Sequence, residues 1–249
     1  MNKLQIVTYN IHKGFSHFQR KMSVHDLRDR LQGLGADVVF LQEVLGTHSR
    51  HQERHGDWPL APQYEFLADT LWSAFAYGKN AVYDAGHHGN AILSKFPIVR
   101  WDNEDISMHR MERRGLLHCE IAVPGWDRPL HCVNVHLGLF APWRRKQVEL
   151  LRQRIERLVP HEDPLVIAGD FNDWRQKVSR QLAESMGIVE VFEHAYGRPA
   201  RSFPAMLPLL QLDRIYIRGF RVRIAHAHRD RRWSGLSDHV ALSALLERN

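Results

Sequence analysis

The sequence predicts an α/β protein in which packed β-sheets are surrounded by helices. Strand-like and helix-like segments alternate in the first half of the chain, and strands predominate in the second half. No internal repeat, low-complexity stretch or flexible linker divides this series. The 249 residues are 44% hydrophobic, which is enough to bury a sizeable core. We therefore expect residues 1–249 to form a single domain.

The elements of the first half follow from apolar periodicity and from helix-capping residues. Leu4–Asn10 has the pattern of a strand. Ser23 is expected to cap a helix over Val24–Leu34, with Asp26 at the capping-box position. The other elements expected here are a buried strand over Val38–Gln42 that ends at Glu43, a helix over Gln63–Phe75 and a strand over Asn90–Ser94.

The second half is expected to consist mostly of strands. Leu116–Val123 and Leu130–His136 flank a turn-like segment and form a hairpin. Pro142 suits the first turn of a long basic helix that runs through Val159. The loop over residues 196–210 is long and contains three prolines, and loops of this length are often functional. The remaining strands are expected over Leu165–Gly169, Gln211–Ile217, Arg221–Ala227 and Val240–Leu246.

The two cysteines lie on the two strands of the expected hairpin. Cys119 and Cys132 are close enough there for a disulfide, but two buried thiols are the stronger expectation because no secretion signal precedes them. The N-terminus lacks a signal-peptide pattern, and no apolar run approaches the roughly 20 residues of a membrane span. We expect a cytoplasmic protein without a transmembrane segment.

The chain is basic, with a formal net charge of +6 and a pI near 9.5. Such a balance attracts polyanions, although solubility alone also accounts for it. Arg144 and Arg154 belong to a basic run on the long helix, which either supports a polyanion or forms a solvated face. The 17 histidines show no coherent metal-ligand spacing, and most are expected at the surface.

One buried strand ends abruptly in the sequence Gly169-Asp170-Phe171-Asn172. An Asp-x-Asn after a strand is by itself an ordinary turn, because both side chains bond their own backbone there. The same position also suits a binding residue, since it is held by the sheet yet open to a ligand. Several other expected strands end in, or lie next to, polar groups of the same kind: Asn10, Glu43, His136, Asp213, Asp238 and His239.

These groups together indicate a chemistry. Carboxylate and amide oxygens without a Cys/His cage suit Mg²⁺ or Mn²⁺. Two histidines provide general acids, bases or phosphate-binding cations, and a buried carboxylate such as Asp213 is suited to orient one of them. A metal, an activated water and cationic donors are the components of phosphoester hydrolysis.

The order of these motifs resembles that of the endonuclease/exonuclease/phosphatase superfamily of metal-dependent phosphoesterases. The resemblance covers nearly the whole chain, from Asn10 to His239. It rests on the single residues Asn10, Glu43 and Asp213 and on these segments: His88-Gly89-Asn90-Ala91-Ile92-Leu93-Ser94, Asn134-Val135-His136, Gly169-Asp170-Phe171-Asn172 and Ser237-Asp238-His239. It implies a four-layer α/β/β/α sandwich, in which two mixed β-sheets pack face to face with helices outside. It places the active site at one edge of that sandwich.

The resemblance also implies how metal and water are held. Glu43 would be the principal ligand of Mg²⁺ or Mn²⁺, with Asn10 beside it and Asp238 near the ion. Asp170 would orient the attacking water and help to deprotonate it. Asn172 would hold a phosphate oxygen.

Substrate-binding roles follow from the same resemblance. His239, paired with Asp213, would contact the scissile phosphate and stabilise the transition state. His136 would be the second histidine and the acid at the leaving oxygen, while which histidine is acid and which is base stays open. Asn90 would lie at the floor of the site, and Arg201 would touch phosphate from a neighbouring loop.

A metal-dependent phosphodiesterase is the function expected from this set. Apurinic endonucleases have Lys two residues after the metal-binding Glu and Tyr in place of His136, whereas here Val44-Leu45 follow Glu43. The alternatives are a nonspecific endonuclease or exonuclease, then a phospholipid- or inositol-phosphate-directed phosphatase, then a non-catalytic binding module. The expected partner is a phosphoester, whether a phospholipid head group, a small phosphodiester or nucleic acid, with peripheral contact to anionic surfaces. No obligate protein partner is expected.

Overall fold

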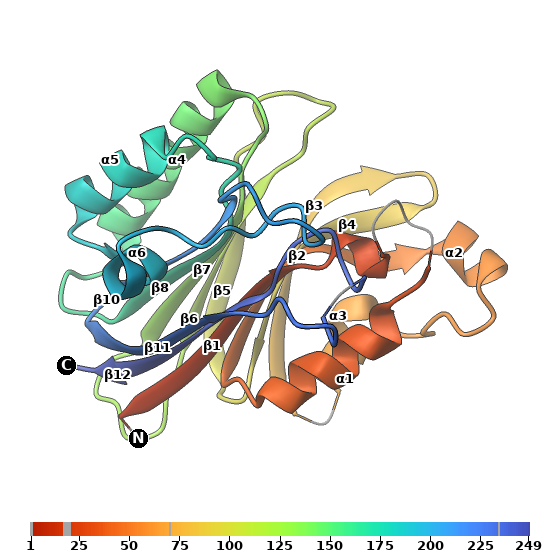
Figure 1. Ribbon diagram of the computed structural model, residues 1–249, viewed down its shortest axis with the longest axis horizontal. Helices are drawn as coiled ribbons and strands as arrows, with labels where there is room; N and C mark the ends of the chain where they lie inside the picture. Colours follow the sequence, from red (N-terminus) through yellow and green to blue (C-terminus); the bar gives the residue numbers. More distant parts are fainter. Residues whose placement is uncertain (1, 17–20, 70, 234) are drawn as a thin grey trace.

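Two six-stranded β-sheets pack face to face in the computed structural model, which describes residues 2–16, 21–69, 71–233 and 235–249 (Figure 1). In spatial order the first sheet contains β11 (Phe220–Ala227), β12 (Leu242–Arg248), β1 (Lys3–Asn10), β2 (Val38–His48), β4 (Gly86–Ser94) and β3 (Ala74–Tyr83). The second contains β5 (Ile98–Asp105), β6 (Gly115–Ile121), β7 (Leu130–His136), β8 (Leu165–Asp170), β10 (Asp213–Arg218) and β9 (Val189–Glu190). Both sheets are mixed, because β1 and β2, and likewise β7 and β8, run parallel within an otherwise antiparallel order.

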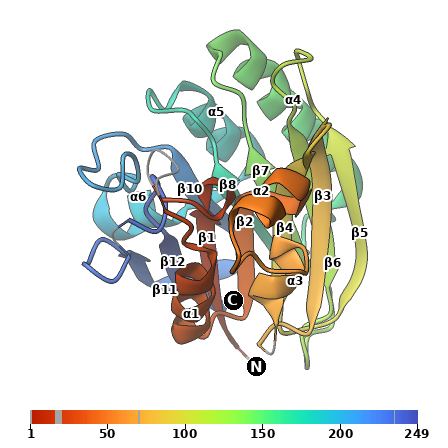
Figure 2. The same ribbon diagram turned by 90° about the vertical axis from the view of Figure 1, so that its right-hand side faces the viewer.

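Helices cover the outer faces of the sheets and complete four layers, as Figures 1 and 2 show. On the first sheet, Leu27 of α1 (Val24–Leu34) and Leu67 of α3 (Gln63–Ala68) pack in one apolar cluster with residues of β1 and β2. On the second sheet, α4 (Ala141–Leu158) and α5 (Lys177–Met186) pack in another. A third cluster fills the space between the sheets, so the expected four-layer sandwich is confirmed.

Two short helices lie away from these outer layers. α2 (Ser49–Arg54) follows β2, whereas α6 (Val191–Tyr196) contacts β10 and β11, one strand from each sheet. α6 therefore bridges an edge where the two sheets meet. None of the described helices is both long enough and apolar enough to span a membrane.

Three local expectations were wrong. The helix expected over Gln63–Phe75 ends at Ala68, and β3 begins at Ala74, while Thr70 lies outside the described residues. Sheet pairing overrides the helical spacing here, because Phe75 pairs with Leu93 of β4.

The other two corrections concern a strand end and a helix cap. β2 does not end at Glu43 but continues to His48. The Ser23 hydroxyl does not cap α1, because it donates instead to the Leu236 carbonyl at 2.7 Å. In both cases contacts with segments distant in sequence replace the structure that the local sequence indicated.

The hairpin of β6 and β7 places the two cysteines directly opposite each other. Cys119 pairs in register with Cys132, and both are buried free thiols. The expectation that both cysteines are buried is therefore confirmed. β5, α5 and α6 were not anticipated; β5 is an edge strand whose side chains are largely exposed, so it lacks the apolar alternation that identifies a strand.

A buried row of polar side chains faces α4 from the second sheet. His118 Nε2 lies 3.0 Å from His131 Nδ1, and His131 Nε2 lies 3.2 Å from Asp163 Oδ2. Burial, with the neighbouring charges of His131 and Arg154, lowers the pKa of His118 from 6.5 to about 3. His118 is therefore neutral in the folded protein near neutral pH.

This histidine makes stability depend on pH. Its pKa is depressed on folding, so its contribution is complete above about pH 7 and is lost as the pH falls from about 6.5 toward 3. We expect His118→Gln to reduce the loss of unfolding free energy between pH 7 and pH 5 by about 2 kcal/mol, measured by urea denaturation. The exposed control His161→Gln should keep the wild-type loss. An equal loss in His118→Gln and wild type would contradict this account.

Candidate active site

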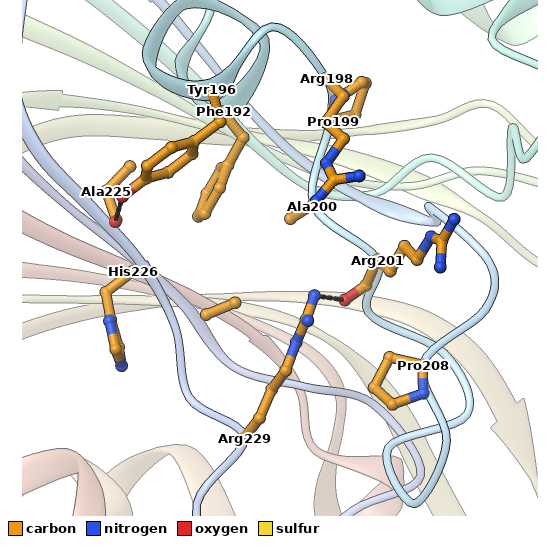
Figure 3. A pocket seen from close by; sticks show the side chains of 11 residues that line it. Phe192, Tyr196, Arg198, Pro199, Ala200, Arg201, Pro208, Ala225, His226 and Arg229 are labelled. Carbon is orange, nitrogen blue, oxygen red and sulfur yellow. Dashed lines mark hydrogen bonds between the residues drawn. The ribbon is translucent and has the colours of Figure 1, made fainter.

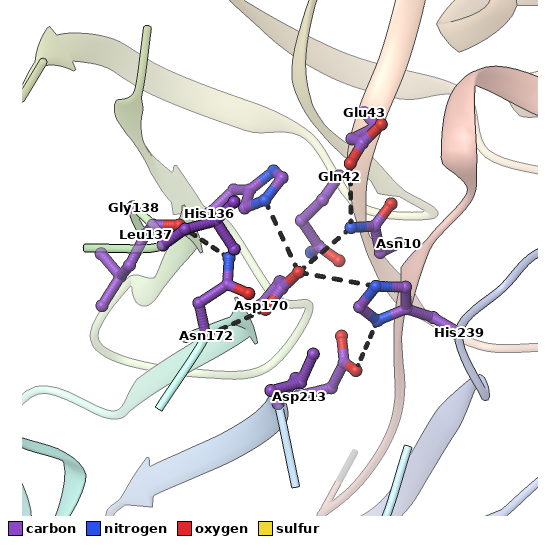
Figure 4. A network of polar contacts seen from close by, with 12 residues as sticks. Asn10, Gln42, Glu43, His136, Leu137, Gly138, Asp170, Asn172, Asp213 and His239 are labelled. Atoms are coloured by element: carbon purple, nitrogen blue, oxygen red, sulfur yellow. Dashed lines mark hydrogen bonds and ion pairs between the residues drawn. The ribbon is translucent and has the colours of Figure 1, made fainter. Parts of the chain in front are cut away.

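Polar side chains from both sheets converge at one edge of the sandwich (Figure 4). Three of them stand side by side on neighbouring strands of the second sheet, because Asp170 is in register with His136 on one side and with Asp213 on the other. Asn10 ends β1 in the first sheet, and its Nδ2 donates to Asp170 Oδ2 across the interface at 3.2 Å. The edge therefore joins the two sheets through functional groups.

Glu43 reaches this edge because β2 is irregular there. The pairing of β2 with β4 shifts register between Leu41 and Val44, and Glu43 has a positive φ of 55°. In a regular strand Glu43 would share the face of Leu41, which packs on the helix side. A β-bulge re-aims a side chain. Here Glu43 Oε1 accepts a hydrogen bond from Asn10 Nδ2 at 3.4 Å, and Lys13 Nζ lies 3.6 Å from Oε2.

The segment after β8 forms a turn and also belongs to the site. The Asn172 backbone N–H donates to Asp170 Oδ1 at 2.9 Å, and Asn172 has a positive φ of 50°. Its Nδ2 donates to the Leu137 carbonyl at 2.8 Å, which anchors the turn to the end of β7. Gly169 is required before it, because a Cβ there would lie 2.0 Å from the Val135 carbonyl oxygen.

A buried ion pair forms the other side of the site. His239 Nδ1 lies 2.8 Å from Asp213 Oδ2, and both residues are almost fully buried. The backbone N–H of His239 donates to Ser237 Oγ at 3.2 Å, and that hydroxyl donates to the Asn10 carbonyl at 2.7 Å. The Phe203 ring, 5.0 Å away between centroids, packs against the imidazole. These contacts fix the orientation of His239.

Asp170 lies between the two imidazoles. Its Oδ2 is 3.5 Å from His136 Nε2 and 3.7 Å from His239 Nε2. Burial raises the pKa of Asp170 to about 6; the charge of His239 opposes this rise, and that of Asp213 adds to it. A carboxylate with such a pKa is a competent proton acceptor at neutral pH.

The two histidines carry different charges. Burial opposes protonation of His239, but the charge of Asp213 and its hydrogen bond outweigh burial and raise the pKa to about 10. Burial and the charge of Arg114 lower the pKa of His136 well below its usual value. The site therefore contains one imidazolium and one neutral imidazole, and the protonated one is His239.

Glu43 stays ionised within this cluster. Burial opposes its ionisation, but nearby positive groups, His136 and Lys13 foremost, lower its pKa to about 2. Because His136 is itself neutral, the cations that lower the Glu43 pKa are Lys13 and the protonated His239. Lys13 was not among the residues predicted from the sequence.

The structure does not bring every predicted residue into the cluster. Asn90 is buried, and its Nδ2 donates to the Gly115 carbonyl at 3.1 Å. Asp238 is partly exposed and lies 3.9 Å from His12 Nδ1. Arg201 is exposed and lines a neighbouring cavity rather than the cluster itself.

The oxygen donors fit a hard divalent cation. Asp170, Asp213 and His239 each offer a ligand atom, and these atoms lie within 4.8 Å of one another. A protonated His239 is a poor ligand, however, so this trio is better suited to proton chemistry. Glu43 provides an ionised carboxylate at a partly exposed position, which is a donor that Mg²⁺ or Mn²⁺ prefers. The buried Asn10 beside it turns Nδ2 toward Glu43, and its Oδ1 accepts from the His12 backbone N–H at 3.1 Å.

The sequence analysis assigned no role to the residues that support the site. Asn134 and Gln42 are fully buried and connect the two sheets, and the Ser202 hydroxyl accepts hydrogen bonds from the backbone of residues 212 and 213. The only available signal was position, because Gln42 precedes Glu43 and Asn134 precedes His136 by two residues. A polar residue inside an apolar strand that leads to a candidate site is therefore a candidate for supporting that site.

Comparisons with known proteins agree with this geometry. The model of the Endonuclease/Exonuclease/phosphatase family matches residues 7–239. The chain is 47% identical over 240 residues to the "Uncharacterized protein YbhP" of Escherichia coli strain K12, covering 96% of this chain and 94% of that one.

Two solved structures show the same fold at low sequence identity. An endonuclease/exonuclease/phosphatase from Beutenbergia cavernae superposes with a TM-score of 0.77 at 17% identity, covering 100% of this chain and 72% of that one. A mannosyl-6-phosphatase from Bacteroides thetaiotaomicron gives 0.74 at 16% identity, covering 98% and 99%. With a matching family model, a close relative and a shared fold, the chain belongs to the endonuclease/exonuclease/phosphatase family, whose members are generally phosphoester hydrolases that depend on a divalent metal.

Proposed function

We propose that this protein is a phosphodiesterase that uses Mg²⁺ or Mn²⁺ and an activated water to attack phosphorus. The observation that carries the proposal is the position of Asp170 between a buried Asp213–His239 ion pair and the Asn10–Glu43 pair. A proton acceptor (Asp170), a cationic donor (His239) and an ionised carboxylate with an amide beside it (Glu43 and Asn10) are thereby held together. These are the components that hydrolysis of a phosphodiester requires.

Asp170 and His239 would divide the proton chemistry. Asp170, with a pKa of about 6, would orient the water and accept its proton as the new oxygen–phosphorus bond forms. His239 would present its Nε2–H to a phosphoryl oxygen and stabilise the charge that develops there. Asp213 would keep His239 protonated and correctly turned, as a buried carboxylate does in other Asp–His pairs.

The remaining predicted residues would hold metal and substrate. Glu43 and Asn10 would bind the cation, with Asp238 on the same side, and the bound ion would supply Lewis-acid stabilisation of the phosphoryl oxygens. Asn172 would offer its second Nδ2 hydrogen to phosphate, since one already bonds the Leu137 carbonyl. Neutral His136 would donate an N–H hydrogen bond to the leaving oxygen, which would take its proton from water, because a histidine with a lowered pKa is not the acid that the resemblance implied.

A nuclease is the second candidate, and its support lies in the exposed arginines before Ser237. Arg229, Arg231 and Arg232 are exposed near the site. The basic helix α4 offers nucleic acid less free positive charge than its composition indicates. Arg152 pairs with two glutamates of the same helix, and Arg154 is buried against Asp102 and Glu104. The interpretation of Arg154 as part of a solvated face is therefore wrong.

Metal dependence can be tested both by the rate of hydrolysis and by the effect of the metal on thermal stability. EDTA should abolish hydrolysis of bis-p-nitrophenyl phosphate, and Mg²⁺ or Mn²⁺ should restore it. Glu43→Gln should lower the rate at least about a hundredfold and should remove the rise in Tm that Mg²⁺ produces in the wild type. Glu120→Gln, a partly exposed glutamate on β6, serves as the control with normal rate and Tm shift. Hydrolysis that survives EDTA would overturn the proposal.

Two buried Asp–His pairs allow a matched comparison of catalysis and stability. Asp213→Asn should lower kcat at least about a hundredfold, because His239 loses the partner that holds its proton and orientation. Asp163→Asn removes the carboxylate from the His131 pair and should reduce stability while leaving kcat within about twofold of wild type. Steady-state kinetics and thermal unfolding measure both effects. Equal kcat values for the two variants would contradict the assigned role of Asp213.

A plasmid assay distinguishes the two candidate functions. Since much of the basic charge on α4 is neutralised internally, we expect supercoiled plasmid to stay intact at low salt under conditions that hydrolyse bis-p-nitrophenyl phosphate. Agarose electrophoresis measures the result. Nicking that weakens as salt is added would favour the nuclease instead.

A further inference from the structure

A cavity opens between α6, the segment that follows it and β11 (Figure 3). Its volume is about 630 Å³, which is within the range of sites that hold small molecules. Phe192 and Tyr196 of α6 form one wall, and Ala225 and Ala227 of β11 form another. The catalytic residues do not line it, so the cavity is separate from the reacting centre.

Positive charge dominates this cavity. Arg198, Arg201 and Arg229 all line it, and we call it the arginine pocket. Among the described residues that form its lining, none is Asp or Glu. The guanidinium groups of Arg198 and Arg229 point toward each other across the hollow, whereas that of Arg201 is turned outward (Figure 3). An anion bound between Arg198 and Arg229 would relieve their mutual repulsion. The pocket is therefore suited to phosphate or a similar multiply charged group.

Two hydrogen bonds hold the walls in place. Tyr196 Oη donates to the Ala225 carbonyl at 2.5 Å and ties α6 to β11. Arg229 Nη2 donates to the Arg201 carbonyl at 2.8 Å and ties the end of β11 to the loop after α6. Figure 3 shows Arg198 and Arg229 projecting toward each other from opposite sides. Most of their N–H donors are left for a ligand, because a guanidinium has five.

The same loop continues directly into the catalytic centre. Arg201 lines the pocket, and the next residue, Ser202, bonds the backbone of Asp213 through its hydroxyl and that of Val240 through its carbonyl. Phe203 packs on the His239 ring. Arg201 and His239 each adjoin the hydrogen-bonded pair of Ser202 and Val240, so the wall of the pocket and the catalytic imidazole are neighbours in space.

We propose that the arginine pocket binds a second phosphate group of the substrate, a few bonds away from the phosphodiester that is cleaved. This inference rests on the proposed function, because it assigns a subsite for the same substrate. It narrows the substrate class to phosphodiesters that carry a further phosphate. Binding there would align the scissile group with Asp170 and His239.

Calorimetry tests the pocket without catalysis. In metal-free buffer with EDTA, inorganic pyrophosphate should bind saturably to the full-length protein. Arg198→Ala and Arg229→Ala should weaken this binding at least about tenfold, the effect of losing one charged hydrogen-bond donor. The control is Arg221→Ala, an exposed arginine on the same strand β11, and it should retain wild-type affinity. Absent binding, or equal affinity in all four proteins, would overturn the assignment.

A pair of chromogenic esters tests the link to substrate. Thymidine 5′-(p-nitrophenyl phosphate) and its 3′-phosphorylated derivative share the same scissile bond and differ by one phosphate. The wild type should prefer the 3′-phosphorylated ester at least about tenfold in kcat/KM, mainly through KM. Arg198→Ala and Arg229→Ala should abolish that preference, whereas Arg221→Ala should keep it.

The outcomes separate this inference from the proposed function. If neither ester is hydrolysed, the phosphodiesterase proposal and this substrate subsite both fail, while calorimetry still shows whether the pocket binds phosphate. If both esters are hydrolysed equally well, the phosphodiesterase stands and the substrate subsite is wrong. Pyrophosphate binding together with equal turnover of the esters would identify the pocket as a site for a free anion, which also overturns the proposal.

Discussion

The site depends on one buried amide that joins the two sheets. Asn134 of β7 is fully buried, and its Nδ2 donates to the carbonyls of Leu41 and Ala91, on two strands of the other sheet, at 2.8 Å each. Its Oδ1 accepts from Gln42 Nε2 at 2.8 Å. Apolar packing alone allows the sheets to slide, whereas these directional bonds permit one relative position. Asn10 can therefore meet Asp170 across the interface.

Around that junction the backbone departs from regular geometry where the chemistry is placed. Glu43 and Asn172 both have positive φ values, and both contribute groups to the cluster. Non-glycine residues in this region cost on the order of 1 kcal/mol or more and persist only where surrounding structure compensates. The buried strands on either side supply that compensation. The bulge and the turn thus deliver side chains that regular strands would point elsewhere.

Much of the fold and many of the candidate residues were predictable from local patterns. Apolar runs identified β1, β7 and β8, and the helix over Val24–Leu34 has the expected bounds. The third strand along the chain, by contrast, begins at Ala74, inside the segment that was expected to be helical, because cross-strand pairing is decided by segments distant in sequence. Lys13 and Ser202 were missed for the same reason, since each acquires its contact only when remote segments meet.

The sequence by itself determined the chemical inventory: carboxylates, amides and histidines at or near strand ends, in an order shared with a hydrolase family. Only the tertiary structure decided the protonation state of each of these groups. His136 and His239 look alike in sequence, yet one is neutral and the other protonated, because only His239 has Asp213 at hydrogen-bond distance. Burial and neighbours set a pKa, and both are properties of the folded chain. The arginine pocket has the same origin, since its residues come from a helix, a loop and a strand that are brought together only by folding.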